Sequence, residues 1–242
     1  PYRADEESYA PDDIKRIVSH CEKQGIQVIP VCSSLGHAEM FLACPEMTHL
    51  AETTEPAGQG RFLEHGRLGM TCPLNEDVYA FFDAYYSDLA ALFPGEYFHA
   101  GLDESWQIGI CPECHRKMLA EGQADPLFAY HVKRIHDILQ KNGKRMMMWD
   151  DMFEIYPAAL EETPHDVVMC TWCYQYAAPC PQDHFLHLER KDLFAEYDRR
   201  GLDYVMCTNT MLAENIASYT RYARQRRPLG GLVTNWERQL LT

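Results

Sequence analysis

Y-F-H-A-G-L-D-E-S-W, residues 97–106, predicts a short buried strand that ends in two adjacent acids. The aromatic and small residues of 97–101 follow a Pro-Gly turn, which is typical of a strand start. Consecutive side chains of a strand point to opposite faces, so Asp103 and Glu104 share one centre only if the strand has already ended. Acids at the carboxyl end of a buried strand are a common source of acid/base chemistry. A solvated Asp-Glu step in a loop is the alternative.

Outward from this stretch, the chain repeats one unit, a helix followed by a short hydrophobic strand. The strands are expected at 26–31, 97–101, 145–149, 167–172, 204–208 and 232–235. The helices are expected at 12–24, 76–93, 126–141, 186–200 and 214–226, and a long surface loop at 52–73. Asn75 is the expected cap of the helix at 76–93. Each strand is a nearly continuous apolar run, which is typical of parallel strands covered on both faces.

Two α/β folds fit this pattern, a doubly wound open sheet and a (β/α)₈ TIM barrel. An open sheet gathers its functional residues near one switch point, whereas here polar and aromatic residues follow strands all along the chain. We therefore predict the barrel. Because the six expected strands cannot close an eight-stranded barrel, we expect residues 1–242 to be a single catalytic domain that supplies about strands 3 to 8 and lacks the first two.

Composition excludes several classes of function. The net charge of −14 and the lack of a Lys/Arg-rich run argue against nucleic acid and anionic membranes as partners. No apolar stretch is long enough to span a membrane, and the first residues, which lack a methionine, do not resemble a signal peptide. Most of the ten cysteines fall in apolar runs, so we expect buried reduced thiols and a cytoplasmic protein.

One cysteine pair has the spacing of half a zinc site. Cys111 and Cys114 form a C-x-x-C motif with His115 beside it, but no matching second pair lies nearby in the sequence. A complete structural site needs four ligands, so the sequence assigns no metal. Whether this pair binds a metal is left open.

Tryptophans gather where strands end. Trp149, Trp172 and Trp236 stand at the ends of expected strands, and Trp106 lies two residues past the two acids. Core packing explains any one tryptophan alone, but three of the four stand within two residues of an acid, and the fourth, Trp172, ends an expected strand as Trp149 and Trp236 do. Indole faces stack on the C–H faces of sugar rings, and carboxylates bind sugar hydroxyls, so this pattern favours a carbohydrate site.

The same residues resemble a known family. F-H-A-G-L-D-E-S-W is similar to the H-x-G-x-D-E signature of family 20 glycoside hydrolases, the β-N-acetylhexosaminidases, and looks closest to the hexosaminidase D-like branch. The resemblance extends to I-P-V-C-S-S-L-G-H-A-E at 29–39, M-M-W-D-D-M-F at 147–153 and T-N-W-E-R at 234–238. It covers essentially the whole chain, and implies a TIM barrel that needs no cofactor and acts on terminal N-acetylhexosamine of carbohydrates.

The resemblance also implies roles for residues. Glu104 would be the general acid/base, and Asp103 would orient the 2-acetamido group, whose carbonyl attacks the anomeric carbon. Substrate-binding roles are implied for His37, His99, Trp149, Asp150, Trp172, Tyr174, Asn209, Trp236 and Glu237. The three tryptophans would wall the acetamido pocket, Tyr174 would donate to its carbonyl, and Glu237 would bind sugar hydroxyls. His37 would support the acid/base, with a purely structural histidine as the alternative.

The sequence departs from the family in three features. The family's sugar-clamping arginine belongs to the first barrel strand, and the acid that pairs with the histidine belongs to the second. We expect both to lie outside this chain. Leu102 stands where many members have glycine or alanine.

Two other functions stay open at this point. A metal-dependent barrel hydrolase or isomerase could draw its donors from the acids and the histidine at the strand ends, namely His37, Glu39, Asp103, Glu104, Asp150 and Asp151. Activity that survives a chelator would exclude it. The second is a catalytically inactive barrel that binds sugars, against which the intact Asp103-Glu104 pair argues.

Overall fold

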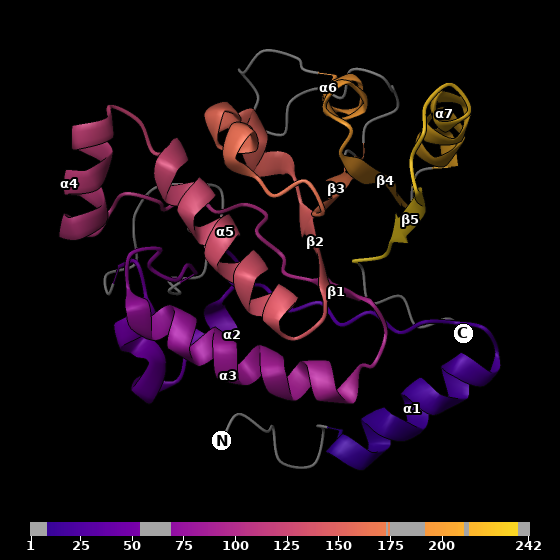
Figure 1. The fold of residues 1–242 in the computed structure, drawn as a ribbon, viewed down its shortest axis with the longest axis horizontal. Helices are drawn as coiled ribbons and strands as arrows, with labels where there is room; N and C mark the ends of the chain where they lie inside the picture. Colours follow the sequence, from indigo (N-terminus) through magenta and orange to yellow (C-terminus); the bar gives the residue numbers. More distant parts are fainter. Residues whose placement is uncertain (1–8, 54–68, 173, 175–191, 211–212, 237–242) are drawn as a thin grey trace.

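The computed structural model describes residues 9–53, 69–172, 174, 192–210 and 213–236 (Figure 1). The α-helices are α1 (Pro11–Lys23), α2 (Glu39–Leu42), α3 (Glu76–Leu92), α4 (Pro112–Glu121), α5 (Asp125–Lys141), α6 (Leu193–Arg200) and α7 (Ala213–Ala223). Short 3₁₀ helices span Pro45–Leu50, Asp151–Glu154 and Pro157–Glu162. The strands are β1 (Tyr97–His99), β2 (Arg145–Trp149), β3 (Val168–Trp172), β4 (Asp203–Asn209) and β5 (Gly230–Thr234). In the described part of the chain, every helix is too short or too polar to cross a membrane.

The five strands form one parallel sheet in chain order, β1-β2-β3-β4-β5. Tyr97 pairs with Arg145 at the start of the sheet, and Asn209 pairs with Thr234 at its other side. Parallel neighbours in chain order require a crossover between every two strands, and helices supply most of these crossovers. The described residues therefore form an arc of a TIM barrel, as the sequence predicts.

The two faces of the sheet belong to two different apolar clusters. Met146 and Met148 of β2 join the large core under the helices, to which α3 and α5 contribute side by side (Figure 1). Met147 and Trp149 point to the opposite face and form the smaller cluster with residues of β3 and β4. This alternation places every second residue of each strand inside the barrel arc. The inward row of β2 ends at Trp149, at the carboxyl edge of the sheet.

Helix ends follow the signals in the sequence. Asn75 caps α3, because its Oδ1 accepts a hydrogen bond of 3.0 Å from the Asp77 amide, as predicted. Pro11 begins α1, and the Asp13 carboxylate accepts from the Ala10 amide at 2.9 Å. The expected helices over 12–24, 76–93, 126–141 and 214–226 are thus confirmed within three residues. For the expected helix 186–200, residues 186–191 lie outside the described chain, and α6 confirms the rest.

The first expected strand is wrong in part. Residues 26–31 contact β1 through a single parallel bridge, Val31 with His99, and form no strand. The Ile26 amide still donates to Cys21 at the end of α1, and Pro30 has no amide hydrogen to donate. The segment is therefore bound to β1 near its carboxyl end, through the Pro30 carbonyl and the Cys32 amide. The strand expected at 97–101 ends at His99, because the backbone turns at Gly101.

Two segments expected to be irregular contain ordered structure. The predicted loop 52–73 lies outside the described residues over 54–68, but its two ends pair through an antiparallel bridge between Ala51 and Thr71. Residues 112–121, where no helix is expected from the sequence, form α4. Pro112 at its first turn and Gly122 at its end are the signals that could have predicted it.

Candidate active site

The loop after β1 carries both acids and has a strained backbone. Gly101 has a φ of +70°, and Leu102 and Glu104 have φ of +80° and +50°. His37 has +55°, and no other non-glycine residue in the described chain has a positive φ. Residues other than glycine rarely adopt a positive φ, because the side chain then crowds the backbone. Such strain persists only where the surrounding structure enforces it, and it concentrates at functional sites. All three strained non-glycine residues of the described chain thus belong to one small neighbourhood.

Two contacts bind this loop to its neighbours. The Glu104 amide donates to Asp151 Oδ2 at 3.0 Å, and the Gly36 amide donates to the buried hydroxyl of Ser105 at 3.1 Å. A side chain at position 36 would come within 2.4 Å of the Asp103 carbonyl, so only glycine allows this approach. The loop 33–37, at the end of the first expected strand, therefore packs directly on the loop that carries the acids.

His37 lies between the two acids. Its Nε2 is 3.1 Å from Glu104 Oε2 and 3.4 Å from Asp103 Oδ2. The hydrogen bond with Glu104, and then the negative charges of Asp103 and Glu104, raise the pKa of His37 to about 9, against the opposing effect of burial. The imidazole is therefore protonated at neutral pH, and the acids share a centre as the sequence predicts.

Asp103 has one buried carboxylate oxygen. Burial raises the pKa of its carboxyl group, while the charge of His37 opposes this rise. Its Oδ1 is buried and has no hydrogen-bond partner among the described residues. A buried carboxylate oxygen without a donor costs free energy, so this oxygen is suited to accept a hydrogen bond from a ligand.

Aromatic side chains form a contiguous cluster beside the acids. The Trp149 ring lies 4.4 Å from the His99 ring and 6.0 Å from the Trp236 ring, between centroids. Trp172 contacts Tyr174 at 5.2 Å, and the Trp236 indole N–H donates to the Tyr174 hydroxyl at 2.6 Å. Trp236 remains 58% exposed, so much of its ring is free to contact a ligand. The structure thus brings together five predicted site residues from β1, β2, β3 and the end of β5.

The two consecutive acids after β2 take different positions. Asp151 Oδ1 accepts from the Trp172 indole N–H at 3.1 Å, and its other oxygen holds the Glu104 amide. Asp150 is buried and accepts from the hydroxyls of Thr171 and Tyr197. The family resemblance implies substrate binding for Asp150, whereas the sequence offers Asp151 only as a possible metal donor. The strand end alone does not reveal which of two adjacent acids faces the site, and the part of Asp150 in substrate binding stays a prediction.

Asn209, Glu237 and His99 are the predicted site residues whose positions remain to be described. Asn209 ends β4, and its backbone amide donates to Asn215 Oδ1 at 3.3 Å. Glu237 lies outside the described residues. His99 is buried, and its Nδ1 accepts from the Gly101 amide at 3.1 Å, so it also supports the turn that precedes the acids.

The arrangement can perform acid/base chemistry on a sugar. It offers one carboxylate with a protonated histidine at hydrogen-bond distance, a second carboxylate with an unsatisfied oxygen, and an aromatic wall. A group of metal-ligating side chains also occurs, but it consists of Glu52, Cys72, Cys111 and Cys114 rather than of these acids.

Comparison with known proteins identifies the family. Residues 2–220 match the glycosyl hydrolase family 20 catalytic domain. A β-hexosaminidase of Porphyromonas gingivalis is 31% identical over 153 residues, which are 60% of this chain and 19% of that protein. A β-hexosaminidase of Vibrio furnissii is 26% identical over 176 residues, or 70% of this chain and 27% of that protein. The chain thus spans less than a third of the length of these relatives.

Solved structures show the same fold. The family 20 exo-β-N-acetylglucosaminidase of Vibrio harveyi, in complex with N-acetylglucosamine, superposes with a TM-score of 0.63 at 24% identity, over 83% of this chain and 28% of that one. The chitobiase of Flavobacterium johnsoniae gives 0.68 at 17% identity, over 96% and 35%. The catalytic domains of such structural neighbours are TIM barrels. The match over most of its length, together with the acids and the aromatic wall at one edge of the sheet, shows that the chain belongs to glycosyl hydrolase family 20.

Proposed function

We propose that the protein removes terminal β-linked N-acetylhexosamine from carbohydrates as a retaining, substrate-assisted glycoside hydrolase, and that residues 1–242 are part of one catalytic barrel domain. The observation that carries the mechanism is the buried Oδ1 of Asp103, which has no hydrogen-bond partner within the described structure. An acetamido N–H is a donor that would satisfy it. The family match supports the substrate class.

In the first step, the substrate's own acetamido oxygen attacks the anomeric carbon. Glu104 first takes up a proton, which the neighbouring His37 imidazolium can supply, and gives it to the glycosidic oxygen, so the bond to the leaving group breaks and an oxazolinium ring forms. Asp103 accepts the acetamido N–H, which orients the carbonyl for attack, and its negative charge stabilises the cationic ring. His37, whose Nε2 is 3.1 Å from Glu104 Oε2, is a positioning residue that holds this carboxyl group in place.

In the second step, Glu104 acts as a base. It takes a proton from a water molecule, which attacks the anomeric carbon from the side the leaving group has vacated and opens the oxazolinium ring. Two inversions give net retention. The exposed Trp236 and the neighbouring Trp149 would stack on the sugar and its acetamido methyl. Tyr174, whose hydroxyl lies 2.6 Å from the Trp236 indole nitrogen, would donate to the carbonyl.

The test is the anomer released first. The complete polypeptide should cleave 4-nitrophenyl β-N-acetylglucosaminide or the galactosaminide, with the β-anomer as the first product in a proton NMR time course. The 4-nitrophenyl β-glucoside, which lacks the acetamido group, is the control and should not be cleaved. An α-anomer as first product would exclude retention. Binding of N-acetylglucosamine without any cleavage would identify an inactive sugar-binding barrel instead.

A further inference from the structure

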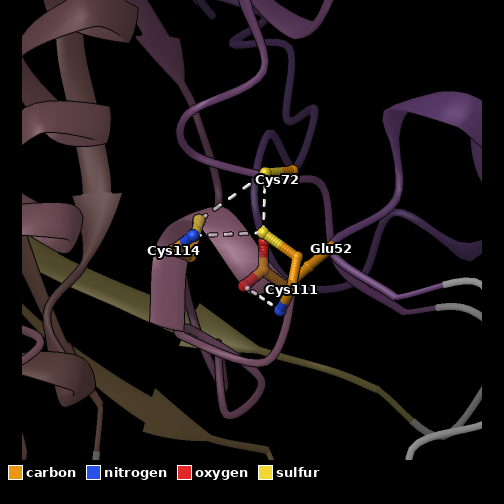
Figure 2. A group of neighbouring side chains, drawn as sticks. All are labelled: Glu52, Cys72, Cys111 and Cys114. Atoms are coloured by element: carbon orange, nitrogen blue, oxygen red, sulfur yellow. Dashed lines mark hydrogen bonds between the residues drawn. The ribbon is translucent and has the colours of Figure 1, made fainter. Parts of the chain in front are cut away.

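Four potential metal ligands gather outside the candidate active site. Glu52, Cys72, Cys111 and Cys114 each place one ligand atom within 4.8 Å of all the others (Figure 2). They come from both ends of the segment 52–72 and from the start of α4. The Cys72 sulfur lies 3.7 Å from the Cys111 sulfur and 3.6 Å from the Cys114 sulfur.

These distances are those of a zinc–thiolate site. With zinc–sulfur bonds of about 2.3 Å in tetrahedral geometry, two thiolate ligands lie about 3.8 Å apart. A disulfide would require about 2.05 Å, and all three cysteines are free. The separations therefore leave room for one metal ion between the sulfur atoms.

The C-x-x-C turn aims its two sulfur atoms at the same point. Cys111 is the residue before the first turn of α4, and its sulfur accepts a hydrogen bond of 3.2 Å from the Cys114 amide. This bond closes the turn, so both side chains face Cys72, as Figure 2 shows. A negatively charged thiolate is a better acceptor for such an amide than a neutral thiol is.

Glu52 supports a metal site independently of the cysteines. It is 1% exposed, and its Oε1 accepts hydrogen bonds of 2.9–3.1 Å from the amides of Gly109, Ile110 and Cys111. Its Oε2 is buried and has no hydrogen-bond partner among the described residues. One oxygen of Glu52 thus fixes the loop and the other has no donor, and a carboxylate oxygen of this residue lies within 4.8 Å of the three sulfur atoms.

The charge of this cluster has no protein counterpart. Glu52 forms no ion pair within the described chain. A buried carboxylate beside three ionisable thiols is costly unless a cation or protons balance it. Three soft sulfur ligands and one carboxylate in a closed, four-ligand arrangement suit Zn²⁺ in a structural site.

We propose that Glu52, Cys72, Cys111 and Cys114 bind a structural Zn²⁺ ion. The ion replaces the protons of the three thiols, which pass to solvent, and takes the free oxygen of Glu52 as its fourth ligand. It would join both ends of the segment 52–72 to the loop that runs from Glu104 to α4. This proposal does not depend on the proposed hydrolase activity.

The sequence showed only half of this site. The C-x-x-C pair was visible, but its partners lie 39 and 59 residues before Cys111, at no recognisable spacing. His115, the expected neighbouring candidate, takes no part, because its Nδ1 lies 3.2 Å from the Gly109 carbonyl oxygen. Only the fold brings the second half of the site into place.

The direct test is the metal content of the complete polypeptide, purified under reducing conditions without a chelator. Elemental analysis should find about one zinc ion per chain. Cys72→Ala and Cys114→Ala should each lose it. Cys32→Ala, which removes a buried thiol outside the cluster, is the matched control and should keep it. Loss of zinc from the control as well would contradict the proposal.

A second measurement does not depend on the folding of any variant. Wild-type protein in which Co²⁺ replaces zinc should show thiolate-to-cobalt charge-transfer absorption and the visible bands of a tetrahedral centre. Glu52→Gln keeps an oxygen for the three amides but loses the charge, so its zinc dissociation constant should rise about 10-fold or more. Reduced wild-type protein that takes up neither zinc nor cobalt, or that holds Cys72, Cys111 or Cys114 in a disulfide, would overturn the proposal.

Discussion

Two histidines, His37 and His131, lie near the two ends of the same short loop and have opposite environments. His37 contacts two carboxylates, and its pKa rises to about 9. His131 on α5 is fully buried, with its nitrogens 3.1 Å from the Tyr79 hydroxyl and 3.2 Å from that of Ser34, and burial lowers its pKa to about 3. Ser34 and His37 are only three residues apart. The same side chain is thus a charged group on one side of the loop and a neutral core group on the other, because its partners differ.

The difference extends to the surroundings of each histidine. Around His131, both ring nitrogens lie within hydrogen-bond distance of neutral hydroxyl groups rather than of carboxylates. Around His37, the backbone is strained at three residues and Asp103 keeps an unsatisfied buried oxygen. Such features reduce stability, and proteins keep them where function needs them. We therefore expect substitutions around His131 to lower stability, and substitutions around His37 to lower activity with either a small loss or a gain in stability.

The largest effect is expected for Glu104→Gln, which removes the proposed acid/base. Its activity on glycosides with poor leaving groups should fall by ~10²–10⁴-fold, because the leaving oxygen then departs without a proton. An activated dinitrophenyl glycoside should lose much less. Equal losses in kcat/KM on phenyl and dinitrophenyl substrates would remove Glu104 from the acid role.

Asp103→Asn should separate activity from stability. Loss of the charge that stabilises the oxazolinium should lower kcat by about 10²–10³-fold. Burial raises the pKa of Asp103, so its ionised form is less stable in the folded protein than in water, and the neutral amide should raise the melting temperature at neutral pH. Thermal unfolding and kinetics on one preparation check both effects. A variant that loses stability and activity together would show that Asp103 is structural.

The smallest effect is expected from the pH dependence of the two histidines. The folded pKa of His131 lies below its ordinary value of 6.5, so its contribution to stability is present above pH 6.5 and is lost as the pH falls towards 3. The folded pKa of His37 lies above that value, so its contribution is present below pH 6.5 and is lost as the pH rises through about 9.

Urea unfolding across this range checks the assignment with two matched variants. His131→Asn should reduce the loss of stability on the acid side, and should also lower overall stability by roughly 1–3 kcal/mol because Tyr79 and Ser34 lose a buried partner. His37→Asn should reduce only the loss on the alkaline side. The same pH profile in both variants would mean that the two environments do not differ as described.

The sequence predicted well those features that depend on local pattern. Apolar runs predicted β2 to β5, the cap at Asn75 predicted the start of α3, and the acids and tryptophans at strand ends predicted a candidate site whose residues the fold places near one another. The sequence did not predict features that depend on contacts between residues far apart in the chain. Asp150 and Asp151 are indistinguishable until the chain folds, and the contact of Asp151 with Trp172 joins the ends of two strands. The partners of Cys111 were hidden for the same reason.

The central claim, that Asp103 serves the acetamido group rather than attacking the sugar, is tested most directly by binding of a thiazoline analogue of the oxazolinium. Calorimetry should show tight binding to the wild type and affinity lower by about 10²-fold in Asp103→Asn, with little change for N-acetylglucosamine itself. Wild-type protein treated with a 2-fluoro glycoside that lacks the acetamido group should stay unlabelled in mass spectra of its digest. Equal thiazoline affinity in both proteins, or a glycosylated peptide containing Asp103, would contradict the mechanism.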